Sequence, residues 1–293
     1  MRPVSRRPRA GFTLAELLVA LVLFSILGAA MLKVLTSQQR SYNAQLSRTG
    51  MQQSIRVAAA ILPGEFRELD AGDGDIVAMS DTSITVHSYR QFGIVCSPPT
   101  LGGVVTGVAI SLRGPLFSSS RDFVVGDSLY VWYEGDGTIR TDDGWVPGRI
   151  VTVSSGNCPT LPNAGSDVKL NVALAMGGAL VNAAGNIPNG APVRGFETRI
   201  YRLYQAPDGK WYLGIKRGGT TDQLIGPLTG STGLTFTYRD AAGAVTATRT
   251  SVARIDVTLR AVTKNPIYNS QGTLSTVSDS VVMSVALRNN PRF

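Results

Sequence analysis

A long apolar segment stands near the start of the chain, from Phe12 to Leu35. The polar residues within it are Thr13, Glu16, Ser25 and Lys33. As a helix, these 24 residues would measure about 36 Å, which is sufficient to cross a hydrocarbon core of about 30 Å. The pattern therefore predicts a membrane-spanning helix over residues 12–35.

The pattern becomes amphipathic after Leu35. Residues 36–62 contain no proline, and Ile55, Ala58, Leu62 and Phe66 recur at the spacing of one helix face. This predicts an amphipathic helix over residues 36–70 that lays an apolar stripe on a sheet. Pro63 is expected either to kink this helix or to start a second short one.

Beyond residue 70 the apolar positions alternate with polar ones, which is typical of half-buried strands separated by turns. The fold class predicted is therefore α+β, with a long N-terminal helix packed on an antiparallel β-sheet domain at residues 71–293. Residues 154–192, rich in Gly, Asn, Ala and Pro, are expected to form a long loop or insertion. The expected strands are 83–89, 127–133, 138–141, 145–153, 193–204, 210–217, 234–239, 252–262 and 280–287.

The positive charge of the chain is concentrated before the apolar segment. Formal net charge is +8, and four arginines stand before Gly11: Arg2, Arg6, Arg7 and Arg9. The positive-inside rule then places the N-terminus in the cytoplasm and everything after the apolar segment outside it. Without residues 1–11 the chain has 24 basic and 20 acidic side chains. We interpret this mild excess as a solvated surface rather than a nucleic-acid interface.

Glu16 is the unexpected residue of the apolar segment, because a carboxylate in a membrane helix costs a few kcal/mol. A free α-amino group at Phe12, created by cleavage after Gly11, would be a suitable partner. Phe12 and Glu16 are four residues apart and share a helix face. Between neighbouring helices, the same pairing would favour one fixed stagger.

These residues resemble a known family. The stretch Gly11-Phe12-Thr13-Leu14-Ala15-Glu16, with a basic leader before it and an apolar run after it, is similar to the prepilin peptidase motif of type IV prepilins and type II secretion pseudopilins. The resemblance implies a pilin-like fold. It implies that prepilin peptidase removes residues 1–11 and methylates Phe12, and that Glu16 serves assembly with other pilins in membrane lipid.

The resemblance also implies a place and a role. Such a chain is not an enzyme and needs no cofactor. It would reside in the inner membrane before its assembly into a pilus or a pseudopilus. Major pilins usually carry a proline partway along the apolar helix, whereas this chain has Met31-Leu32-Lys33-Val34 there, which favours a minor subunit. Segments 201–212, 234–240 and 253–259 resemble PilW-type minor pilins and J-class pseudopilins.

Two other interpretations remain open. An ordinary secretory signal also has a basic start and an apolar core, and Gly28-Ala29-Ala30 could be its cleavage site. A DNA- or surface-binding adhesin could use the same anchor, because basic and aromatic residues interleave in one predicted hairpin. The basic residues there are Arg194, Arg199, Arg202, Lys210, Lys216 and Arg217, and the aromatic ones are Tyr201, Tyr204, Trp211 and Tyr212.

Cysteines and acidic residues supply the remaining candidate sites. Cys96 and Cys158 are both in the part expected to be exported, where a pair often forms a disulfide; two separate thiols are the alternative. Asp70, Asp73 and Asp75 are weak candidates for calcium, but their spacing is not that of an EF-hand. A solvated turn that caps the helix explains them better.

Overall fold

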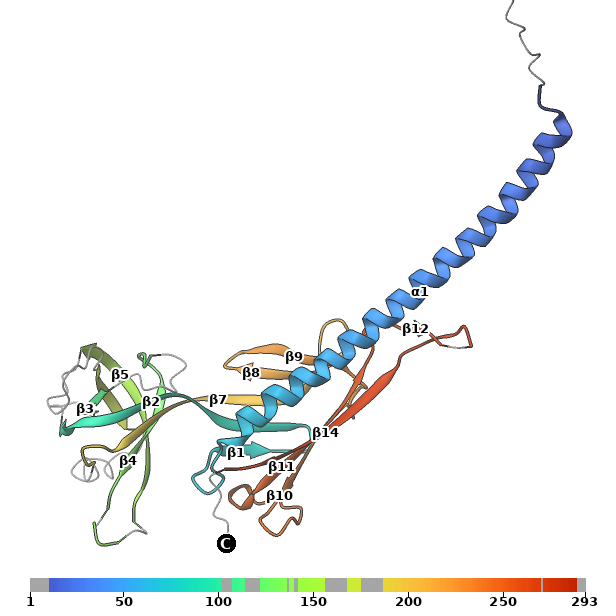
Figure 1. Cartoon of the computed structure of the whole chain (residues 1–293). Helices are drawn as coiled ribbons and strands as arrows, with labels where there is room; N and C mark the ends of the chain where they lie inside the picture. The colour runs from blue at the N-terminus through green and yellow to red at the C-terminus, as the bar shows by residue number, and fades with distance from the viewer. Residues whose placement is uncertain are drawn as a thin grey trace, which may run out of the picture.

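The computed structural model describes residues 11–101, 107–113, 122–135, 137–139, 142–155, 168–174, 187–269 and 271–288. One long helix is followed by a β-rich body (Figure 1). The elements are α1 (Leu14–Arg67), β1 (Ile76–Met79), β2 (Ser83–Leu101), β3 (Gly107–Arg113), β4 (Ser128–Tyr133), β5 (Gly144–Ser155), β6 (Val168–Leu174), β7 (Pro192–Gln205), β8 (Trp211–Arg217), β9 (Thr220–Leu228), β10 (Leu234–Arg239), the short 3₁₀ helix η2 (Arg249–Ser251), β11 (Arg254–Val262), β12 (Ile267–Tyr268), β13 (Leu274–Ser275) and β14 (Ser278–Ala286).

Helix α1 is a single element of 54 residues, about 80 Å long. It continues through Pro63 to Arg67, so no second helix begins at that proline. It ends at Arg67, three residues before the predicted end at residue 70, and Glu68 is its C-cap. Its first half is exposed and apolar enough to cross a membrane, by length and composition. Its second half buries Met51, Ala58, Leu62 and Phe66.

We call the half of the body that packs on α1 the helix lobe. It contains β1, β8–β11, β14 and the adjoining halves of β2 and β7. The helix lies between β9 and β14 (Figure 1). Ser54 donates to the Gly226 carbonyl of β9, and the Arg67 carbonyl accepts from the N–H of Arg288, just after β14. Phe66 meets the ring of Tyr201 edge-on at 5.2 Å. The predicted apolar stripe is thus the face that fills this core.

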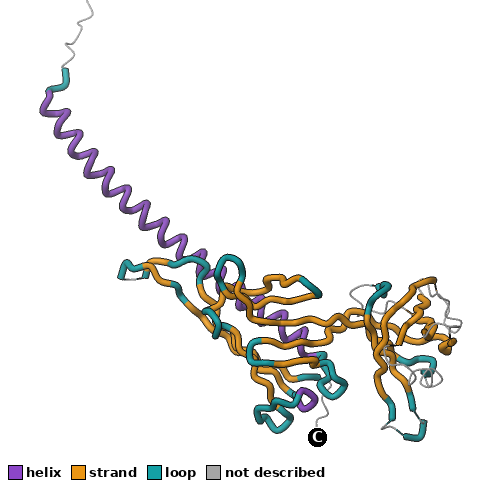
Figure 2. The backbone as a smooth tube through the Cα atoms, turned by 180° about the vertical axis from the view of Figure 1, so that it is seen from behind, coloured by secondary structure: helices purple, strands orange, loops and turns teal. Residues whose placement is uncertain are grey.

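Strands β3–β6 and the other halves of β2 and β7 form a second lobe, which we call the ring lobe. Its strand order β2-β3-β6-β5-β4-β7 closes on itself, because β2 and β7 also pair with each other, and every pairing is antiparallel. Closure removes the open sheet edges at which strands otherwise aggregate. The ring encloses a core of its own, which includes Val95, Ile110, Leu129, Ile150 and Val172. This lobe lies away from the N-terminus of α1 (Figures 1 and 2).

A β-bulge at Arg90 marks the junction of the two lobes. On β2, Tyr89 opposes Phe196 and Gln91 opposes Gly195, so Arg90 is one extra residue. The bulge reverses which positions face inward. Ile84 and Val86 are buried in the helix lobe, whereas Val95 is buried in the ring lobe.

Most predicted strands are present, but β1, β3 and β9 are among the strands that were not predicted, and two predicted features differ. The hairpin of β7 and β8 pairs Gln205 with Trp211, as expected from the Ala-Pro-Asp-Gly turn. Segment 154–192 is more than a loop, because it contains β6, which pairs with β3 and β5. The described residues 137–139 form a turn rather than a strand, so β4 and β5 make one hairpin instead of two.

Candidate processing and assembly site

The peptide bond between Gly11 and Phe12 lies in non-helical chain just before α1. Phe12 is 79% exposed, and Thr13 has extended backbone dihedrals. A peptidase generally needs an extended, accessible substrate backbone, because a helical peptide bond is occupied by its own hydrogen bonds. The geometry at this bond therefore suits cleavage.

Thr13 and Glu16 cap the helix reciprocally. The Thr13 hydroxyl accepts from the Glu16 N–H at 3.3 Å, and Glu16 Oε2 accepts from the Thr13 N–H at 2.9 Å. The pattern Thr-x-x-Glu is the sequence signature of this capping box. It satisfies two N–H groups that the first turn of a helix otherwise leaves unpaired.

The capping box corrects one inference from the sequence. Glu16 was expected to lack a partner before cleavage, but Thr13 already provides one. Both side-chain bonds of this carboxylate use Oε2, and Oε1 has no hydrogen-bond partner in the described part of the chain. Glu16 can therefore hold the helix start and still offer one oxygen to an external cation.

The surface that follows Glu16 is apolar on all sides. From Leu14 to Leu35 no residue is buried, and Phe24 is 77% exposed. A helix that is apolar all round must be covered by lipid or by other protein. The helix start and this surface together form a unit suited to a membrane or to a bundle of similar helices.

Comparisons with known proteins agree with this geometry. Residues 6–32 match the family described as the prokaryotic N-terminal methylation motif. A stretch of 65 residues is 37% identical to the type II secretion system protein J of Vibrio cholerae serotype O1. The chain is a type IV pilin- or pseudopilin-like protein. The second match covers 22% of this pilin-like chain and 29% of the relative, so less than a third of that protein is spanned. No solved structure matches the pilin-like chain significantly.

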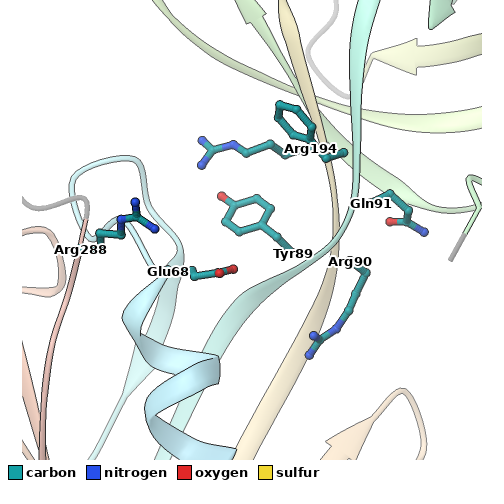
Figure 3. A pocket seen from close by; sticks show the side chains of 7 residues that line it. Glu68, Tyr89, Arg90, Gln91, Arg194 and Arg288 are labelled. Carbon is teal, nitrogen blue, oxygen red and sulfur yellow. The ribbon is translucent and has the colours of Figure 1, made fainter. Parts of the chain in front are cut away.

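A second feature of the pilin-like protein is a cavity of about 340 Å³ at the junction of its lobes. It is lined by Glu68, Tyr89, Arg90, Gln91, Phe92, Arg194 and Arg288. Figure 3 shows the side chains of Arg194, Tyr89, Glu68 and Arg288 around this space, with Gln91 turned away from it. Arg194 stacks on Trp145, at 3.6 Å from the ring centroid, and on Tyr89 at 4.5 Å.

Glu65 ties the last turn of α1 to this junction. Its carboxylate accepts from Tyr201 at 2.8 Å, from Ser88 at 3.0 Å and from Arg90 at 2.7 Å. Burial alone would raise the pKa of Glu65, but the Tyr201 hydrogen bond and the charge of Arg90 outweigh it and lower that pKa. A carboxylate near a helix C-terminus opposes the helix dipole, and these partners offset that cost.

The three aspartates proposed as weak calcium candidates have other partners. Asp75 is fully buried and accepts from the Tyr89 hydroxyl and from the Asp70 N–H. Asp73 lies 3.6 Å from Arg194. Burial raises the pKa of Asp75 to about 6. No cluster of three metal-binding side chains occurs within the described ranges. The residues lie in the turn that follows α1, but this turn differs from the solvated helix cap of the alternative interpretation, because Asp75 is buried and Glu68 is the C-cap.

The other predicted site residues are distributed over both lobes. Cys96 is disulfide-bonded, but Cys158 lies outside the described residues, so their pairing stays a prediction. His87 contacts the rings of Tyr130 and Phe196 and is a packing residue. Tyr201 is buried and Arg199 pairs with Glu65, so two members of the hairpin considered for DNA are occupied within the protein.

Proposed function

We propose that the chain is a minor pilin or pseudopilin that prepilin peptidase cuts after Gly11 and methylates at Phe12. The observation that carries this is the arrangement at the N-terminus. An exposed, non-helical Gly11–Phe12 bond stands before a capped helix, and that helix is apolar and exposed for its first half. A secretory signal would not require the helix to continue into the core of the folded domain, as α1 does.

In this proposal the protein is a structural subunit rather than an enzyme. The N-terminus faces the cytoplasm and the β-rich body lies on the other side of the inner membrane. The first half of α1 then leaves the membrane lipid and packs among the helices of other pilins. The unbroken helix between residues 14 and 62, which lacks proline, supports a minor rather than a major subunit. Two lobes form a bulky body, which suits the tip of a filament better than its stacked shaft.

Glu16 acts in assembly through the oxygen that the capping box leaves unbonded. The freed amino group of a neighbouring Phe12 would pair with Glu16 Oε1 while Oε2 stays on Thr13. In an apolar setting, breaking such a pair is strongly destabilising because it leaves one charge alone. Subunits would consequently prefer the register in which the amine of one meets the carboxylate of the next.

Mass spectrometry of the mature N-terminus tests the processing. Methylated Phe12 as the first residue is expected, whereas a chain that begins near Met31 would show an ordinary signal peptide and overturn the proposal.

Glu16→Gln tests the assembly role separately from the capping role. Glutamine at this position can still complete a capping box, so the helix start should persist while the charge is lost. Cleavage should remain normal, and incorporation into filaments should fall at least tenfold, measured by immunoblot of sheared filaments. Thr13→Ala is the matched control, because it removes the cap and keeps the charge. If Glu16→Gln assembles normally and Thr13→Ala does not, the residue serves only as a cap.

A further inference from the structure

A hairpin leaves the sheet between β11 and β14, and we call its described residues, 263–269 and 271–277, the arm. Its base is closed by Thr263 and Val277, whose backbone bond measures 2.9 Å, and β12 pairs with β13 along it. Asn269 organises the tip, since its side chain accepts from the Gln271 and Thr273 N–H groups. The arm is thus a formed element, and it projects beside α1 toward the N-terminal half of the helix (Figure 1).

The arm touches α1 at the point nearest to the expected membrane. Ile267 is buried, and the Arg40 guanidinium lies over the Tyr268 ring at 4.3 Å from its centroid. A cavity of about 380 Å³ opens here, lined on the helix side by Arg40, Asn43, Ala44, Leu46 and Ser47. Arg40 comes five residues after Leu35, which is about 7 Å along a helix. The headgroup layer on each side of a bilayer is about 5–8 Å thick, so Arg40 falls within it.

The side chains around this cavity have the composition of a membrane interface. Of the residues that line it, Leu46 is 53% exposed, Leu274 59% and Tyr268 40%, and Tyr42 on the same stretch of α1 is 62% exposed. Aromatic residues gather at the headgroup level of membranes because one end of the ring system is apolar and the other polar. Tyr42 and Leu46 belong to the same helix as the lipid-facing segment, and Tyr268 and Leu274 belong to the arm beside it.

The charges next to this surface are all positive. Between Leu17 and Gly64 the helix has four basic residues, Lys33, Arg40, Arg48 and Arg56, and no acidic residue. Within the described residues, neither Arg40 nor Lys264 of the arm forms an ion pair with a carboxylate. Basic residues at this level attract anionic headgroups.

We propose that the arm and residues 33–46 of α1 form a lipid-docking surface, with Arg40 facing the phosphate of an anionic phospholipid. This inference rests on the membrane anchoring in the proposed function. Lipid is the occupant because the surface begins where the membrane-spanning segment ends and bears cations and aromatic side chains together. Docking would hold the β-rich body against the membrane until the subunit is extracted into a filament.

The test uses the full chain in lipid nanodiscs, whose two faces are both open to solvent. An environment-sensitive fluorophore is attached at Leu274→Cys in the arm, or at Val245→Cys as the control. Val245 is 69% exposed and lies in the turn between β10 and β11. Discs of phosphatidylethanolamine with phosphatidylglycerol are compared with discs of phosphatidylcholine alone, under non-reducing conditions.

We expect blue-shifted emission and severalfold weaker iodide quenching at position 274 in the anionic discs, with position 245 unchanged. Arg40→Gln should weaken the protection. Arg56→Gln, which removes a charge 16 residues further along the helix, should not, and circular dichroism confirms that both variants fold.

Three results would overturn the proposal. Equal quenching at both positions in the anionic discs excludes lipid docking but leaves the anchoring intact. Protection at position 274 only after a second pilin-like chain is added makes the surface a protein interface. Failure of the chain to enter discs at all removes the anchoring and this inference together.

Discussion

Single carboxylates have very different surroundings in this protein. Glu16 is exposed at the start of α1 and bonds to Thr13. Glu65 is half-buried and accepts from Tyr201 and from two other side chains. Asp75 is fully buried, with one hydroxyl and one backbone N–H as partners. These differences determine which carboxylate favours the folded state when it is ionised.

Asp75 should make the folded state less stable as pH rises. Its pKa is about 6 in the folded protein, against an ordinary value of 3.8. Between these values the folded state binds more protons than the unfolded state, so stability decreases with increasing pH. A shift of about two units corresponds to about 3 kcal/mol lost between pH 4 and pH 7.

Asp75→Asn should remove most of this pH dependence, which urea unfolding at pH 4 and pH 7 measures. The exposed Asp279→Asn should leave it unchanged. Glu65 has the opposite effect on stability. Its pKa is lowered in the folded protein, so its contribution to the free energy of unfolding is lost as pH falls. The difference in pH dependence between wild type and Asp75→Asn isolates the contribution of Asp75. An equal difference for the Asp279→Asn control would refute the assignment of this pH dependence to Asp75.

At the scale of elements, the junction of the lobes depends on close contact between β2 and β7. Gln91 is buried there and donates to Asp127 Oδ2 at 2.9 Å and to the Asp122 carbonyl at 3.3 Å. It passes directly over Gly195, where a Cβ atom would lie 2.2 Å from Gln91 Oε1. The two strands can continue from one lobe into the other only because position 195 has no side chain.

Gly195→Ala should therefore destabilise the protein. The added methyl group must displace the Gln91 amide and break its bonds to the ring lobe, and overpacking of this kind costs about 1–3 kcal/mol. Thermal unfolding measures the effect. Gly219→Ala is the control, because a Cβ there meets nothing within 4 Å. Equal melting temperatures for the two variants would contradict the close packing described at Gly195.

At the scale of the whole molecule, two hydrophobic cores share two continuous strands. Ile84 and Tyr201 belong to the core of the helix lobe, and Val95 and Val193 to that of the ring lobe. The helix lobe is covered by α1, whereas the ring lobe is closed by strand pairing alone. A change confined to one lobe should then affect the local stability of that lobe more than the other.

Removal of the expected disulfide tests this separation. Cys96 lies on β2 within the ring lobe. In the chain-entropy model, a loop of the length between Cys96 and Cys158 contributes about 4 kcal/mol. The double variant Cys96→Ser, Cys158→Ser should lose hydrogen-exchange protection in β3 to β6, with smaller changes in β8, β10 and β11. A uniform loss over both lobes would show that the body unfolds as one unit.

The sequence predicted elements wherever one local pattern decides the structure. The apolar run after Phe12 and the stripe through Ala58 and Leu62 predicted the two halves of α1, and alternation predicted β7, β8 and β10. The Thr13-x-x-Glu16 pattern also identifies the cap, because it is the sequence signature of a capping box. At the processing site, the sequence predicted which residues take part. The hydrogen bonds of Glu16 depend on where α1 begins, which only the structure shows.

Sequence alone determined the N-terminal motif, the α+β class and the antiparallel strands, because each depends on neighbours within a few residues. Only the tertiary structure decided the closed ring, which joins β3 to β6 and β4 to β7 across long separations. It also decided the bulge at Arg90, where the alternation of β2 reverses because the strand enters a second core. The position of the arm beside Arg40 was also decided by the tertiary structure, since its contact with α1 joins residues more than two hundred positions apart.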